Sequence, residues 1–192
     1  MRKLSFLEIK FRLKTYLSLA LVLIGCVTAS ASNVDYGEEF GVLSFEKGTE
    51  AVVAGKYSRV SLSQLHYKLG THSLEWNWKR PGACISVPGV IPYLKENPNP
   101  KETSISTFVF WVYADKAQEG SLRFSFRKNG RECCHFDYKL GFTGWRGAWV
   151  AFDRDMEGCP EEGMDEVVIS APSQVRKGRL WFDGIITSAF ED

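Results

Sequence analysis

Hydrophobic and polar residues alternate along much of the chain, which is the pattern of half-buried β-strands. Leu122, Phe124 and Phe126 alternate with polar side chains in one run, and a second alternating run covers 131–140. The two runs are joined through Asn129-Gly130, a dipeptide that readily adopts the positive φ angles of a tight turn. The sequence therefore predicts a β-hairpin with one apolar and one polar face.

Comparable runs, separated by Gly, Pro and Asn at short intervals, predict an all-β fold. So many short strands fit two packed antiparallel sheets, a β-sandwich or jelly roll. The segment 107–113 is apolar on both faces, so we expect it to form a central strand covered on both sides. The predicted strands are 41–46, 57–62, 72–79, 83–87, 104–113, 120–128, 131–140, 145–153, 165–170 and 179–188.

One folded domain, over 35–192, is the simplest organisation. Pro88–Lys101 contains four Pro and two Asn and reads as a long surface loop. No helix of normal length, internal repeat or linker is indicated after the N-terminal segment. The aromatic content of 14%, with six Trp, predicts a well-packed core rather than disorder.

The first 31 residues have the features of an export signal. Basic residues lie between Arg2 and Lys14, an apolar run covers 16–25, and 29–31 is an A-x-A cleavage pattern. Alternatively, 23–26 resembles a bacterial lipobox, in which Cys26 would carry the lipid. The protein is therefore expected to be exported, as a secreted or periplasmic protein or as an outer-membrane lipoprotein. Membrane association is expected only through that lipid anchor.

Four further cysteines would then lie in an oxidising compartment. They are Cys84, Cys133, Cys134 and Cys159. Neighbouring strand residues point to opposite faces, so Cys133 and Cys134 are not expected to share a partner. Their spacing lacks two C-x-x-C pairs, which argues against zinc. Free thiols and at least one disulfide both remain open.

Candidate catalytic groups are few. His66, His72 and His135 are the only histidines, and no nucleophile elbow, P-loop or H-E-x-x-H motif occurs. The acidic pairs Glu161-Glu162 and Asp153-Asp155 lie in polar, turn-like contexts, where solvated charge is the ordinary interpretation. Because the net charge is only +1, any attraction for an acidic ligand must come from a local patch, and nucleic acid is not expected as a partner.

Several stretches, in order along the chain, resemble the N-terminal domain of chondroitin-sulfate-ABC-type polysaccharide lyases. The resemblance implies a β-jelly roll similar to carbohydrate-binding modules and galactose-binding domains. In that family an α/α toroid follows and carries the lyase chemistry on His, Tyr, Arg and Glu residues. None of those residues can be matched here, because the chain ends near the last strand of the first domain. The stretches are 43–46, 66–79, 108–113, 142–150, 154–156, 162–166 and 178–183.

Similarity to jelly-roll carbohydrate modules also implies a structural calcium ion. Such ions are held between the first strand, the loop before the second long strand, and the last strand. Calcium takes several oxygen ligands, which include backbone carbonyls. An alternative for Asp183, which lies within the apolar run 180–186, is a buried carboxylate that is only hydrogen-bonded, or paired with Arg. The corresponding positions are Ser44 and His72, through their carbonyls, with Glu46, Glu75 and Asp183.

Two surfaces could bind sugar. Trp rings can stack on sugar faces, although most of the six Trp are expected in the core. The polar face of the predicted hairpin is the second candidate, because Arg123, Arg127, His135 and Lys139 can meet sulfates or carboxylates of a glycosaminoglycan. Asp137, in the middle of that face, weakens its basic character.

The sequence is consistent with two functions. The first is a non-catalytic N-terminal accessory domain of a chondroitin lyase, which assists in binding a glycosaminoglycan such as chondroitin sulfate. The second is a structural module that packs against a lyase catalytic domain and binds no sugar. In both cases no enzymatic activity is expected from this chain alone.

Overall fold

The structure is a computed structural model that describes residues 42–89, 91, 93–95 and 105–191. The predicted export signal 1–31, with Cys26, and much of the predicted loop 88–101 lie outside these residues. Within the described ranges, no helix is long and apolar enough to span a membrane.

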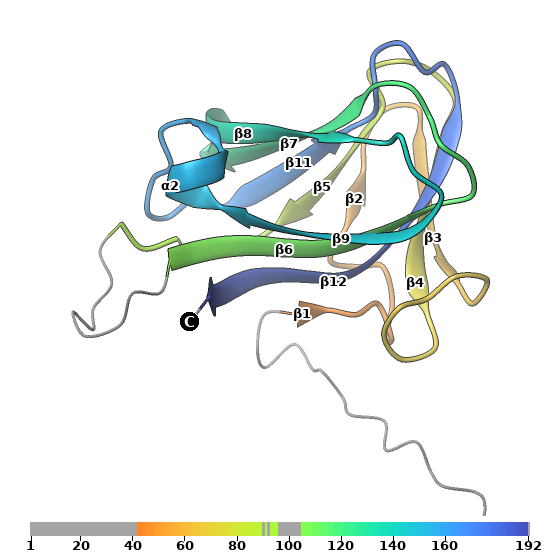
Figure 1. Cartoon of the computed structure of the whole chain (residues 1–192), viewed down its shortest axis with the longest axis horizontal. Helices are drawn as coiled ribbons and strands as arrows, with labels where there is room; N and C mark the ends of the chain where they lie inside the picture. Colours follow the sequence, from red (N-terminus) through yellow and green to blue (C-terminus); the bar gives the residue numbers. More distant parts are fainter. Residues whose placement is uncertain (1–41, 90, 92, 96–104, 192) are drawn as a thin grey trace, which may run out of the picture. The chain divides into compact units, whose positions relative to one another are not determined.

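Two antiparallel six-stranded sheets face each other, which confirms the predicted β-sandwich (Figure 1). In the first, here called sheet A, the strand order is β3-β4-β12-β6-β9, and β1 also pairs with β12. In sheet B the order is β10-β8-β7-β11-β5-β2. Sheet A comprises β1 (Val42–Leu43), β3 (Ser58–Ser63), β4 (Ser73–Trp78), β6 (Ile105–Ala114), β9 (Gly144–Ala151) and β12 (Gly178–Glu191). Sheet B comprises β2 (Val53–Ala54), β5 (Cys84–Pro88), β7 (Ser121–Lys128), β8 (Arg131–Lys139), β10 (Glu157–Gly158) and β11 (Glu166–Ser170).

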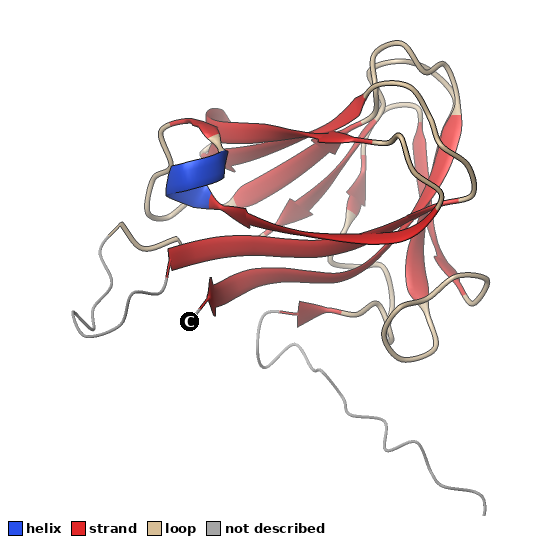
Figure 2. Cartoon of the chain, in the orientation of Figure 1, coloured by secondary structure: helices blue, strands red, loops and turns tan. Residues whose placement is uncertain are grey.

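Each predicted strand has a counterpart, and the differences have local causes. The first strand ends at Leu43 rather than 46, because Phe45 has a φ of 58°, which is incompatible with an extended strand. The strand predicted over 145–153 ends at Ala151, whose amide donates to Asp155 Oδ2, and α2 (Phe152–Asp155) follows. Figure 2 shows this short helix at one end of the sandwich. The two-residue strands β2 and β10 were not predicted.

A cluster of phenylalanine rings joins the two sheets. From β6, Phe108 and Phe110 point into the core and meet rings of β7: Phe110 lies 4.6 Å from Phe124 between ring centroids. Phe124 in turn stacks on Phe136 of β8, with centroids 4.6 Å apart and ring planes only 6° from parallel. The central position predicted for 107–113 is confirmed, because β6 lies between β12 and β9 and its residues Thr107 to Phe110 are buried on both faces.

We expect Phe124→Ala to lower the free energy of unfolding by about 3–5 kcal/mol, because it removes a fully buried ring and leaves a cavity among other rings. Urea titration followed by Trp fluorescence measures the change. Val53→Ala is the matched control, since Val53 is 55% exposed and its truncation should cost little. Equal effects of the two substitutions would contradict the importance of the ring cluster.

Candidate functional site

The outer face of sheet B brings the four predicted sugar-binding residues together. In the β7–β8 pairing, Arg123 lies opposite Asp137, Ser125 opposite His135, and Ser121 opposite Lys139. A register shift between Phe126 and Arg127 places Arg127 opposite Glu132. Because alternate strand residues share a face, the predicted donors share the solvent side of the sheet.

Carboxylates neutralise much of this face. Arg123 Nη2 lies 2.9 Å from Glu132 Oε1, and the same oxygen is 3.1 Å from His135 Nδ1. The other ring nitrogen of His135 is 3.3 Å from Glu157 Oε2, and Arg127 Nη1 is 4.0 Å from Glu166 Oε2.

The charged state of Glu132 is favoured by its neighbours. Although burial opposes the change, hydrogen bonds from Ser125 and Arg123 lower the pKa of Glu132. Three of the four predicted donors therefore have acidic neighbours, and Lys139 is the exposed exception. The face is mixed in charge rather than basic.

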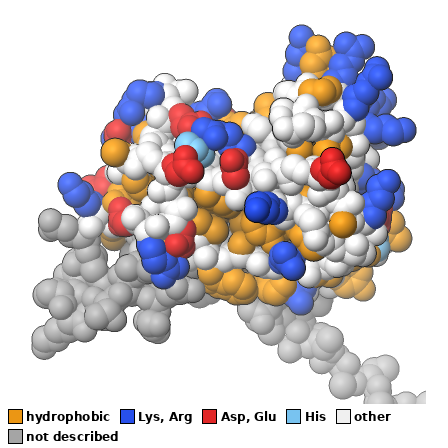
Figure 3. All heavy atoms as spheres, turned by 45° about the horizontal axis from the view of Figure 1, so that its top comes forward, with side chains coloured by type: hydrophobic (Ala, Val, Ile, Leu, Met, Phe, Trp, Pro, Cys, Tyr) orange, Lys and Arg blue, Asp and Glu red, His pale blue; other side chains and the backbone are white. Residues whose placement is uncertain are grey.

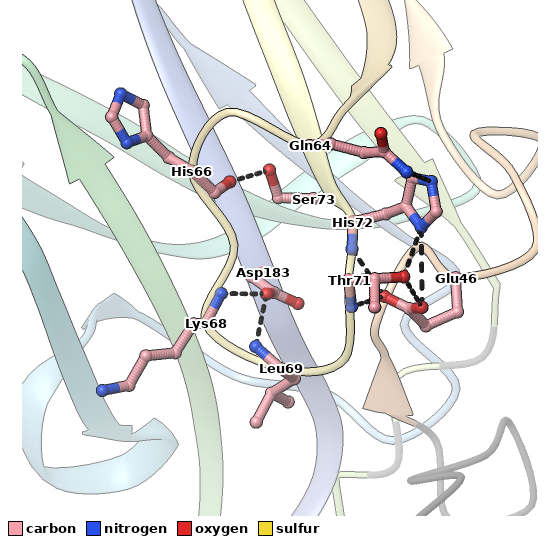
Figure 4. Close-up of polar contacts among 9 residues, drawn as sticks. All are labelled: Glu46, Gln64, His66, Lys68, Leu69, Thr71, His72, Ser73 and Asp183. Carbon is pink, nitrogen blue, oxygen red and sulfur yellow. Dashed lines mark hydrogen bonds and ion pairs between the residues drawn. The ribbon is translucent and has the colours of Figure 1, made fainter. Parts of the chain in front are cut away.

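Two of the residues predicted to hold calcium, Glu46 and Asp183, contact the segment 64–72, which connects β3 to β4 and ends at His72 (Figure 4). Glu46 Oε1 accepts hydrogen bonds from the amides of Thr71 and His72, both at 2.8 Å. Its Oε2 accepts from Thr71 Oγ1 at 2.8 Å. Although burial opposes the change, these bonds lower the pKa of Glu46. Glu46 therefore fixes the end of the segment that leads into β4.

Asp183 holds the same segment from within the sheet. Its Oδ2 accepts hydrogen bonds from the amides of Lys68, at 2.7 Å, and Leu69, at 2.8 Å, while Oδ1 accepts from the amide of Gly184 at 2.7 Å. The side chain is fully buried, and burial raises its pKa to about 6 despite these bonds. The negative charge of Glu46 adds to the increase. The partners of this buried carboxylate are thus backbone amides.

The five residues predicted to bind calcium do not form a complete coordination site in this structure. In the described part of the chain, no three His, Cys, Asp or Glu side chains are grouped where they could hold a metal ion. Glu75 Oε1 instead accepts from Asn77 Nδ2 at 2.7 Å, and the structure gives no side-chain partner for Ser44. Glu46 and Asp183 repel each other through space, which a cation would relieve, but both already accept amide hydrogen bonds. Calcium at Ser44, Glu46, His72, Glu75 and Asp183 stays a prediction.

The remaining acids and histidines serve other contacts. His66 stacks on Tyr113 with ring centroids 3.8 Å apart and lies 3.3 Å from Asp115. Glu161 pairs with Arg131 at 2.6 Å, and Asp153 accepts a hydrogen bond from Tyr93. Glu161 and Glu162 line a cavity of about 510 Å³ beside Tyr93, but Glu161 is engaged there by Arg131 and Lys128.

The tryptophans divide between core and surface. Trp76, Trp78 and Trp181 are buried, whereas Trp149 is 50% exposed and packs edge-to-face on Trp111, with ring centroids 5.8 Å apart. The four cysteines outside the predicted signal carry free thiols in this structure. Cys134 is buried against methionine sulfurs, and burial raises its pKa to about 12.

Sequence reasoning missed one group of basic residues. Lys79, Lys116, Lys177 and Arg179 surround a cavity at one end of the sandwich. The three lysines come from the connections after β4, β6 and β11, and Arg179 comes from the start of β12, so no local pattern reveals them.

We expect Asp183→Asn to lower the free energy of unfolding by about 1–3 kcal/mol, because the amide nitrogen would face backbone donors. The pKa of Asp183 is higher in the folded than in the unfolded chain, so protonation of this carboxyl favours the folded state. This contribution to the free energy of unfolding is fully present below about pH 4 and is lost as pH rises through about 6. Urea titrations of both proteins across this range, in metal-free buffer, measure the difference. Glu75→Gln is the control, with one partner and partial exposure.

A bound calcium ion would change the outcome of these titrations. A bound cation would favour the charged carboxylate and reverse this pH dependence. Chelation should then lower the melting temperature of the unaltered chain, and Asp183→Ala should remove that sensitivity. A melting temperature that chelator leaves unchanged in calcium-loaded protein would contradict the ion and favour the hydrogen-bonded carboxylate.

Comparison with known proteins identifies relatives by sequence. The family model described as "Lyase, N terminal" matches residues 39–192. The chain is 40% identical over 152 residues to a chondroitin sulfate ABC exolyase of Bacteroides thetaiotaomicron, and 35% identical over 154 residues to one of Proteus vulgaris. Each alignment covers 79% of this chain but 15% of the relative, so the chain spans about a seventh of their length.

Solved structures share the fold at low sequence identity. A family 4 carbohydrate-binding module matches with a TM-score of 0.51 at 13% identity, covering 77% of this chain and 100% of the module. A xylan-binding CBM22 domain of Paenibacillus barcinonensis matches with a TM-score of 0.50 at 14% identity, covering 77% and 94%. These similarities show the β-sandwich alone. The sequence matches show more: the chain belongs to the family of N-terminal domains of chondroitin lyases.

Proposed function

We propose that this domain is a non-catalytic accessory domain that binds acidic polysaccharide, such as chondroitin sulfate, for a chondroitin lyase. The observation that carries the proposal is the 40% identity to a chondroitin sulfate ABC exolyase over 152 residues. The exposed polar face of the β7–β8 hairpin and the connections at one end of the sandwich offer surface to a polymer. Export through 1–31, by secretion or by a lipid on Cys26, and a structural calcium ion belong to the same proposal.

The hairpin face supports only weak binding. Arg123, Arg127 and His135 each have a carboxylate within 4.0 Å, so an anionic polymer must compete with Glu132, Glu157 and Glu166. Exposed ion pairs of this kind contribute about 1 kcal/mol or less each.

A second candidate is a structural module that packs against a catalytic domain. It is favoured by apolar side chains on the surface: Trp149 is 50% exposed, and Leu65 and Tyr67 of the β3–β4 connection are 63% and 48% exposed. Exposed apolar surface is typical of contacts with another protein domain.

We expect titration calorimetry of this chain with chondroitin sulfate at low salt to show modest binding. Affinity should fall steeply as ionic strength rises, because exposed charges are screened over a Debye length of about 10 Å at 0.1 M salt. Uncharged dextran is the control polymer. No heat with chondroitin sulfate at any salt concentration would favour the structural module.

We expect no lyase activity from this chain. The acidic residues that sequence reasoning considered are held in ion pairs or hydrogen bonds, as Glu161 is with Arg131 and Asp153 with Tyr93. Incubation with chondroitin sulfate should give no rise in the ultraviolet absorbance of unsaturated product, while an active lyase serves as positive control. Turnover at catalytic protein concentrations would refute an accessory role.

A further inference from the structure

Lys and Arg side chains gather at one end of the sandwich. Figure 3 shows them at the upper right, and the same end in Figure 1 carries the connections after β4, β6 and β11. A cavity of about 550 Å³ lies there, within the size range of small-ligand sites. We call its surroundings the basic end. Its lining residues are Asn77, Trp78, Lys79, Asp115, Lys116, Gln118, Lys177, Gly178 and Arg179.

The basic end differs from the hairpin face in how its charges are balanced. Arg179 Nη2 lies 2.7 Å from Asp115 Oδ2. No carboxylate of the described residues is within 4.0 Å of Lys79, Lys116 or Lys177, and all three are exposed. In a chain of net charge +1, this is a local excess of positive charge. A local excess around a concave surface concentrates anions there.

Further cations lie beside residues that line the cavity. The β3–β4–β12 register places Arg59 and Arg179 on either side of Asn77, in one row across the outer face of sheet A. Lys56 Nζ lies 4.9 Å from the ring centroid of Tyr57, and the Arg80 guanidinium carbon lies 5.2 Å from the same centroid. The row and the ring extend the positive surface beyond the cavity, as a linear polymer requires.

Packing in the core holds this end in shape. A Cβ on Gly178 would come within 2.1 Å of the Trp78 indole, so only glycine leaves room for that ring at the start of β12. The indole Nε1 donates to the carbonyl of Val175 at 3.3 Å, which ties the β11–β12 connection to β4.

Arg179 is held in place as well. Its guanidinium carbon lies 4.6 Å from the ring centroid of Trp181, which holds the planar group against the sheet. A guanidinium so placed presents several donors to a carboxylate or sulfate group.

We infer that the basic end is the principal contact for acidic polysaccharide, through Lys79, Lys116, Lys177 and Arg179. The inference rests on the proposed function and replaces the hairpin face as the main surface. The ligand class is a linear polysaccharide that carries carboxylate or sulfate groups. The cations of the basic end come from three connections and the start of β12, whereas those of the hairpin face come from β7 and β8, so substitutions can alter each group by itself.

The test compares two double variants that each remove two positive charges. Lys116→Ala with Lys177→Ala alters the basic end, and Arg123→Ala with Arg127→Ala alters the hairpin face. We expect the first to raise the Kd for chondroitin sulfate about tenfold at low salt and to flatten its salt dependence. The second should change Kd less than about twofold, because its charges are already paired. Melting temperatures check that each variant is folded.

Four other outcomes would contradict binding at the basic end or the proposed function. Retained affinity in the Lys116/Lys177 variant, with loss in the Arg123/Arg127 variant, would return the contact to the hairpin. Equal losses would show unspecific attraction to total charge and would overturn a defined site. Equal binding of duplex DNA would overturn the polysaccharide assignment. Absence of binding by the unaltered chain would overturn the proposed function itself.

Discussion

The contact between phenylalanine rings of β6, β7 and β8 is the constraint on which this domain depends. Phe110, Phe124 and Phe136 meet across the space between the sheets with centroids 4.6 Å apart in successive pairs. To keep these rings inside, each strand must present its intervening residues outward. The exposed outward positions can therefore carry charges and half-exposed rings without loss of the core. The arrangement separates what holds the fold together from what meets other molecules.

Two carboxylates, one buried and one partly buried, fix the segment 64–72 against sheet A. Asp183 and Glu46 each accept backbone amide hydrogen bonds from this segment. A connection without sheet partners has amides that need acceptors, and the carboxylates provide them. The same two groups lie close enough to repel each other, which raises the pKa of Asp183 further above its usual range. A cation would relieve this electrostatic repulsion. The repulsion also makes the stability of the site depend on the protonation of Asp183.

The alternation of residues predicted the strands and the pairing of β7 with β8, because period and turn chemistry are local properties of the chain. The two-residue strands β2 and β10 have too few residues to show a period. The sequence also placed Arg123, Arg127, His135 and Lys139 on one face, and the structure agrees. It did not show that Glu157 and Glu166 come from β10 and β11 to lie beside them. The basic end was missed for the same reason, since its members meet only after the sheets are assembled.

Under the proposed function, Gly178 contributes to recognition without touching a ligand. It lies between Lys177, the last residue of the β11–β12 connection, and Arg179, the second residue of β12. Because the Trp78 indole occupies the space beside Gly178, any side chain at this position would displace the backbone that carries both cations. The position of the backbone that carries these two residues thus depends on core packing. A substitution in the core at Gly178 would therefore alter the charged surface at this end of the sandwich, although glycine itself carries no charge.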